Sequence, residues 1–162
     1  DGMTLEEIAA SFFVQPESRA LFPDPGDDAA LVDAVYANLL ERAPDAAGRA
    51  YWIDALRQGD VSRPEFMLAV INGARADTGD PADARVVADK GKIGLYYAPV
   101  NGLTDVDNAA DAMAAYARAA PVASLDAARA LIDGYAAAAD DPAGEMEFTV
   151  ALAGVVADPF AA

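Results

Sequence analysis

The stretch VYANLLERAPDAAGRAYWIDALRQGDVSRPEFMLAVI, residues 35–71, decides the fold. It contains three apolar-periodic segments separated by two sets of helix stop and start signals. At the first break, Pro44 interrupts the pattern and Asp45 can cap the second segment. At the second break, Gly59 can end that segment and Ser62 can cap the third. The stretch therefore predicts three short helices that each bury one face.

The same signals continue outward from this stretch in both directions. Roughly a quarter of the residues are Ala, the strongest helix former, and β-branched residues are few. We therefore predict an all-α fold, a compact bundle of about eight short helices with orthogonal and antiparallel packing. The predicted helices cover about residues 5–14, 31–40, 46–57, 63–71, 84–97, 106–119, 125–139 and 144–156.

A polar hinge, TGDPAD at residues 78–83, suggests how the chain is organised. We predict a helical repeat domain over 1–77 and a helical extension packing on it over 78–162. Residues 2–17 resemble the start of the third segment, since Thr4 and Ser62 each begin a capping box. We interpret 2–17 as part of a preceding repeat, with two independent but similar helices as the alternative.

Eight positions at fixed spacing within 35–71 carry a resemblance to a known family: Tyr36, Pro44, Asp45, Gly48, Tyr51, Trp52, Gly59 and Ser62. They resemble the signature of the bacterial domain-of-unknown-function 4214 family, which is itself distantly similar to the helical repeat of phycobilisome linker proteins. Residues 88–116 resemble the helical extension that commonly follows the signature. The resemblance implies a module of large secreted or surface-attached bacterial proteins, often beside calcium-binding RTX repeats or in S-layer-like proteins.

The signature has a structural interpretation first. Gly48 in the first turn of a helix costs about 1 kcal/mol relative to Ala, so its presence suggests that a neighbouring group lies too close for a Cβ. We expect Trp52 to fill the centre of a four-helix core. Tyr51, about 100° further round the helix, is expected at the edge of that core.

Charge and composition exclude several classes of function. The chain carries 27 Asp plus Glu against 11 Lys plus Arg, a net charge of −16, which argues against binding to nucleic acid or to anionic membrane surfaces. It contains no His and no Cys, so the imidazole base, the thiolate nucleophile and the usual zinc ligands are missing. We therefore expect no enzyme, and no apolar run is long enough for membrane insertion. The first residues lack a secretion signal, and we expect a fragment of a longer protein.

Two acidic clusters are weak candidates for calcium, and no other cofactor is expected. One lies in a Pro/Gly loop, and the other begins like an EF-hand loop, but alanines occupy the next ligand and glycine positions. The alternative is that these acids cap helices and stay solvated. The candidate ligands are Asp24, Asp27, Asp28, Asp105 and Asp107.

A candidate binding surface lies near the end of the predicted helix 84–97. Tyr96 and Tyr97 are flanked there by Lys92 and Asn101, and exposed tyrosines stack on sugars and on partner surfaces. The alternative is that both rings pack inside the extension.

These observations predict a non-catalytic helical module of a larger secreted or surface-displayed bacterial protein, serving attachment, assembly or spacing. Its partners would be neighbouring domains of the same protein. The alternative is a domain that binds carbohydrate or lipopolysaccharide, with or without calcium, and anchors its protein outside the cell or on its surface.

Overall fold

The computed structural model describes residues 26–139 and 157–161, together with residues 2, 4, 7, 10, 11 and 15. The chain divides into two compact units, unit 1 (Asp1–Val87) and unit 2 (Ala88–Ala162), and the domain division predicted after residue 77 stays a prediction. Each unit is considered by itself below.

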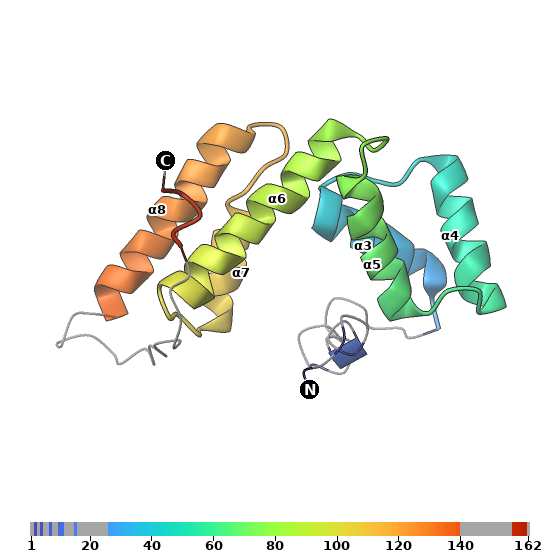
Figure 1. The fold of residues 1–162 in the computed structure, drawn as a ribbon, viewed down its shortest axis with the longest axis horizontal. Helices are drawn as coiled ribbons and strands as arrows, with labels where there is room; N and C mark the ends of the chain where they lie inside the picture. The colour runs from blue at the N-terminus through green and yellow to red at the C-terminus, as the bar shows by residue number, and fades with distance from the viewer. Residues whose placement is uncertain are drawn as a thin grey trace. The chain divides into compact units, whose positions relative to one another are not determined.

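The described residues contain helices and no strand, which confirms the all-α class (Figure 1). They form six α-helices, fewer than the about eight expected for the whole chain. Apart from residues 7, 10 and 11, which are helical, the helices predicted over 5–14 and 144–156 lie outside the described residues. The elements are α3 (Asp28–Leu40), α4 (Ala46–Gln58), α5 (Arg63–Arg75), α6 (Pro81–Leu95), the π-helical turn η1 (Tyr96–Val100), α7 (Val106–Ala114) and α8 (Pro121–Ala139).

The predicted caps set the ends of the helices in unit 1. The Ser62 hydroxyl accepts the backbone N–H of Glu65 at 3.4 Å, and the Glu65 carboxylate accepts the backbone N–H of Ser62 at 2.7 Å. Thr4 and Glu7 form the same reciprocal pair, at 3.2 and 2.7 Å. Both capping boxes are thus confirmed, while the wider repeat over 2–17 stays a prediction.

Helices α3, α4 and α5 bury one apolar cluster in unit 1 (Figure 1). Phe66 on α5 lies at its centre with no exposed surface, and it packs with side chains from all three helices. Trp52 does not fill this centre as expected, because it is only partly buried and lies against the rim of the cluster. The buried members are Leu31, Val32, Val35, Leu40, Ile53, Phe66, Val70 and Ala74.

Three prolines explain where the helices of the extension differ from the prediction. Pro81 and Pro121 begin α6 and α8, earlier than expected, because proline is well tolerated in the first turn of a helix. Pro99 cannot donate a backbone hydrogen bond, and the chain around it widens into η1, where the N–H of Asn101 reaches the carbonyl of Tyr96 at 3.2 Å. Helix α7 ends at Ala114, five residues before the predicted end at 119.

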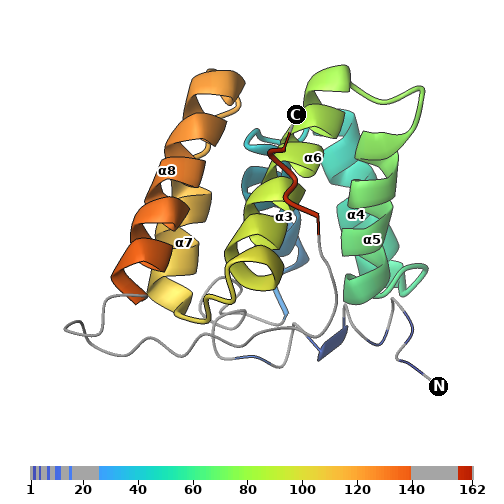
Figure 2. The same cartoon turned by 60° about the vertical axis from the view of Figure 1, so that its left-hand side comes forward.

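Helices α7 and α8 lie side by side in unit 2 (Figure 2). Ile93, Leu103 and Ile132 are fully buried there, and Ala112 and Ala128 bury small faces of the two helices. Small residues allow the two backbones to approach closely while each helix keeps a polar outer face. Across the residues that the structure describes, no helix is long and apolar enough to cross a membrane.

Truncating Phe66 tests the position of the core in unit 1. Phe66→Ala is expected to lower the free energy of unfolding by about 3–5 kcal/mol, because it removes a fully buried ring and leaves a cavity. Tyr51→Ala is the control, since Tyr51 is 64% exposed and its loss should cost less than about 0.5 kcal/mol. Urea denaturation of both variants measures the difference, and equal losses would contradict this assignment of the core.

Candidate functional site

Three signature aromatics meet on the surface of unit 1, and we call Tyr36, Tyr51 and Trp52 the signature face. The Trp52 Nε1–H donates to the Tyr36 hydroxyl at 3.2 Å, joining α4 to α3. The Tyr51 ring meets the Trp52 ring edge-on, with centroids 4.9 Å apart, and Trp52 lies 5.0 Å from Phe66 in the core. The signature face is therefore anchored on its inner side and exposed at Tyr51.

An arginine extends this face at the end of α3. The Arg42 guanidinium lies 5.2 Å from the centre of the Tyr36 ring, within reach of a cation–π interaction. Its Nε and Nη2 also donate to the two oxygens of Asp83, at 2.9 and 2.6 Å. Asp83 is only 4% exposed, and the hydrogen bond between them raises the pKa of Arg42. This pair holds the first turn of α6 to the loop after α3.

Asp45 and Gly48 lie against each other at the start of α4. The Gly48 N–H donates to Asp45 Oδ1 at 2.8 Å, which caps the start of α4. A Cβ on Gly48 would lie 3.3 Å from Asp45 Oδ2, so the close neighbour predicted from the sequence is the cap of the glycine's own helix. The Gly48 N–H lowers the pKa of Asp45, because it stabilises the charged carboxylate.

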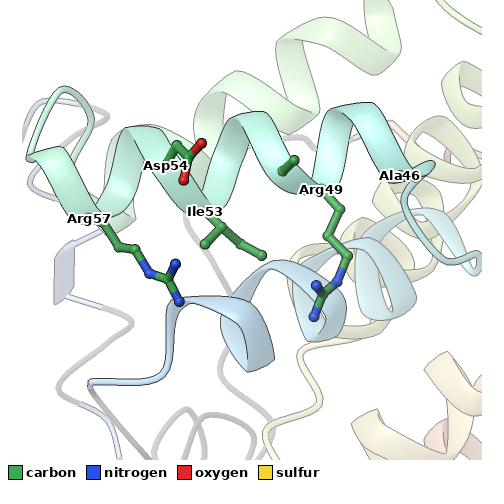
Figure 3. Close-up of a pocket in the computed structure, with 6 residues that line it drawn as sticks. Ala46, Arg49, Ile53, Asp54 and Arg57 are labelled. Atoms are coloured by element: carbon green, nitrogen blue, oxygen red, sulfur yellow. The ribbon is translucent and has the colours of Figure 1, made fainter.

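A shallow groove of about 350 Å³ follows one side of α4 (Figure 3). One side of α4 carries the side chains of Arg49, Ile53 and Arg57, and Asp54 points away from them (Figure 3). Arg49 is committed to Asp33, with its Nε and Nη2 at 2.7 and 2.8 Å from the two carboxylate oxygens. That bond lowers the pKa of Asp33. Within the described part of the chain, Arg57 forms no ion pair.

The structure brings Tyr96 and Tyr97 into the interior of unit 2 and not to its surface. They are 7% and 5% exposed, so the predicted stacking surface is replaced by the packing alternative. The Tyr96 hydroxyl donates to Asp133 at 2.6 Å, which together with burial raises the pKa of Tyr96, and the Tyr97 hydroxyl donates to the carbonyl of Asp105. Asn101 turns back to the carbonyl of Tyr96 at 2.7 Å, and Lys92 lies 3.6 Å from Asp89.

The candidate calcium ligands are engaged in local structure. Asp27 and Asp105 accept the N–H groups of Ala30 and Asn108, at 2.9 and 2.8 Å, and so cap α3 and α7. Asp28 pairs with Arg63 at 3.1 Å, and Asp107 lies in the first turn of α7. Asp24 lies outside the described residues. Over the described ranges, no three acidic side chains converge as metal ligands would.

Sequence reasoning missed the arginine pairs of unit 1, among them Arg42–Asp83 and Arg49–Asp33. Arg42 and Asp83 are far apart along the chain, and nothing in their local sequence signals a pair. Asp33 and Arg49 lie on adjacent helices, and a signal for them was present, since both fall on the polar side of their helical patterns. Pairing them would have required the relative placement of α3 and α4.

The described residues form an all-helical module. The signature residues among them cap helices, as Asp45 and Ser62 do, or contact other aromatic side chains, as Trp52 does. Residues 9–76 match the family model described as Domain of unknown function (DUF4214), and this match supports the resemblance seen at residues 35–71. The match also takes in part of the segment predicted as a preceding repeat. No curated protein and no solved structure matched the chain significantly.

Removing Arg42 tests how much its pair with the buried carboxylate of Asp83 contributes to the stability of unit 1. Arg42→Ala is expected to cost about 2–3 kcal/mol of unfolding free energy, somewhat less than the 3–5 kcal/mol of a fully buried pair because Arg42 is partly exposed. Arg49→Ala is the matched control, since its pair with Asp33 is half-exposed on both sides and should cost less than about 1 kcal/mol. Chemical denaturation of both variants measures the costs, and a larger loss in Arg49→Ala would refute this ranking.

The cap of α4 should make unit 1 sensitive to acid. Because the native pKa of Asp45 lies below its ordinary 3.8, the stabilisation is complete above pH 3.8 and is lost as the pH falls through the native pKa. Asp45→Asn keeps a good N-cap without the titrating charge, so the drop in stability between pH 7 and pH 3 should be smaller than in the wild type. Urea denaturation at both pH values measures it, with Asp60→Asn as the control that keeps the wild-type drop.

Proposed function

We propose that this chain is a non-catalytic helical module of a larger secreted or surface-displayed bacterial protein, and that it serves attachment, assembly or spacing. The observation that carries the proposal is the structural role of each described signature residue. Asp45 and Ser62 cap helices, Gly59 ends α4 in the left-handed conformation at φ 74°, and Trp52 and Tyr36 are tied to each other. A signature used in this way preserves a fold and its surface and not a set of reacting groups.

The electrostatics of the chain support the same function. With a net charge of −16, copies of the module repel one another and stay soluble, which suits a unit that is exposed and repeated along a surface. The resemblance at residues 35–71 implies that such modules occur in secreted and surface-attached proteins, and this context is part of the proposal.

Deleting the coding region of the chain from its parent gene tests the proposal. The fraction of the parent protein retained on intact cells, measured by quantitative immunoblotting of cells and medium, is expected to fall several-fold. The same gene carrying Arg49→Ala is the control, because that change leaves the fold in place. Unchanged retention together with loss of an enzymatic activity would overturn the proposal.

A second candidate, binding of surface carbohydrate, is favoured by the exposed part of the signature face. Tyr51 is 64% exposed beside the partly buried Trp52, and aromatic rings held this way offer a flat apolar surface next to polar groups. We infer that any such binding would use Tyr51, since Tyr96 and Tyr97 are buried.

Tyr51→Ala separates the two candidates. If the chain binds carbohydrate through the signature face, the variant should lose binding to lipopolysaccharide or to a glycan array at least tenfold while keeping its melting temperature. Tyr135→Ala on α8 is the control, and parallel titrations with calcium and with a chelator test the ion. Equal binding by Tyr51→Ala and the wild type would exclude this surface.

A further inference from the structure

A cluster in unit 2 that neither the signature nor the proposed function uses lies around Arg129 on α8. Its guanidinium carbon is 5.6 Å from the centre of the Tyr96 ring and 5.3 Å from that of Phe160. The two rings meet edge-on, with centroids 5.0 Å apart and planes at 72°. One arginine is therefore shared between a ring of η1 and a ring of the segment 157–161.

Carboxylates complete this cluster. Arg129 lies 3.8 Å from Asp158 of the segment and 3.9 Å from Asp133, one turn further along α8. Asp133 also accepts the Tyr96 hydroxyl at 2.6 Å, which fixes the orientation of that ring. The segment 157–161 thus meets a ring, a cation and an acid that contact one another.

The docked segment has a compact shape of its own. The N–H of Phe160 donates to Asp158 Oδ1 at 2.8 Å, across Pro159. This turn directs the Asp158 carboxylate and the Phe160 ring toward Arg129. The ring of Pro159 restricts the backbone of the free segment, so less conformational freedom is lost when the segment binds. An acidic residue, a proline and an aromatic residue in sequence therefore match the cation and the ring of the surface.

We propose that Tyr96, Arg129 and Asp133 form a binding site for short peptides of the type Asp-Pro-Phe, occupied in this chain by its own residues 158–160. The site opens to solvent at Arg129, whose side chain is 40% exposed, and the segment contacts that arginine through Asp158 and Phe160. Residues 140–156 join the segment to α8 along the chain, so release of the segment breaks no covalent connection. A peptide of the same type from another domain can then compete for the site.

The test uses the full chain, labelled with ¹⁵N, and the free peptide ADPFAA, the sequence of residues 157–162. In the wild type, the Arg129 Nε–H resonance should be displaced upfield by the two rings. Phe160→Ala should remove the part of that displacement that comes from the Phe160 ring, and adding ADPFAA should restore it. A peptide in which alanine replaces the phenylalanine should not.

Competition by the chain's own segment gives the quantitative readout. If the segment fills the site nine times in ten, the free peptide should bind the wild type about tenfold more weakly than it binds the Phe160→Ala chain. Arg129→Lys added to Phe160→Ala keeps the charge but loses the planar contact with the rings, and it should abolish binding. Val122→Ala, at an exposed site on α8, is the control and should bind as the wild type does.

Several outcomes would overturn the proposal. One is equal peptide affinity in the wild type and in Phe160→Ala, and another is failure of ADPFAA to restore the resonance. A dimer that disappears in Phe160→Ala, detected by light scattering, would place the segment in a second copy and contradict occupation by the chain's own residues. Should Phe160→Ala unfold unit 2, Asp158→Ala replaces it, with an expected affinity above the wild type's, and an unchanged affinity would then count against the site.

Discussion

The carboxylate of Asp45 fixes where α4 begins, and the side chains on that helix take their positions from it. Each residue turns an α-helix by about 100°, so a start displaced by one residue would move Trp52 off the core and Tyr51 toward it. The hydrogen bond from Gly48 at 2.8 Å selects one start, and the absence of a Cβ on Gly48 leaves room for the carboxylate. The cap thus determines which aromatic faces inward and which faces solvent.

The two units satisfy their polar groups in different ways. In unit 1 the Arg42–Asp83 pair closes the rim of an apolar core, so its charges meet where one side still touches water. In unit 2, the buried rings of Tyr96 and Tyr116 donate their hydroxyls to Asp133 and Asp89, and Asp133 is itself half-exposed. A phenol whose hydroxyl finds an acceptor keeps its ring in the core and supplies the hydrogen bond that burial demands. Tyr97 is buried in the same way and donates to the carbonyl of Asp105, so both tyrosines that suggested a surface have partners within unit 2.

Local signals made the caps of unit 1 predictable from the sequence. The starts at Asp45 and Ser62 and the left-handed end at Gly59 depend on residues within one turn of each other. The π-helical turn at Pro99 and the early starts at Pro81 and Pro121 were missed, because a proline can either end a helix or begin one. Which aromatic ring lies at the centre of the core was harder still to predict. Trp52 and Phe66 both carry large rings, and only the packing of α3, α4 and α5 decides which of them is buried at the centre.

The ion pairs of the arginines bear on how the net charge of −16 is distributed. Arg42, Arg49, Arg63 and Arg129 are each paired with an aspartate, and each of these pairs joins two different parts of the chain. The capping carboxylate of Asp45 favours its charged form, because the backbone N–H of Gly48 lowers its pKa. Each ion pair removes one positive and one negative charge together, so the whole net charge of −16 stays on the groups outside these pairs. Such an excess of negative charge gives repulsion between copies of the chain, which is strongest at low ionic strength.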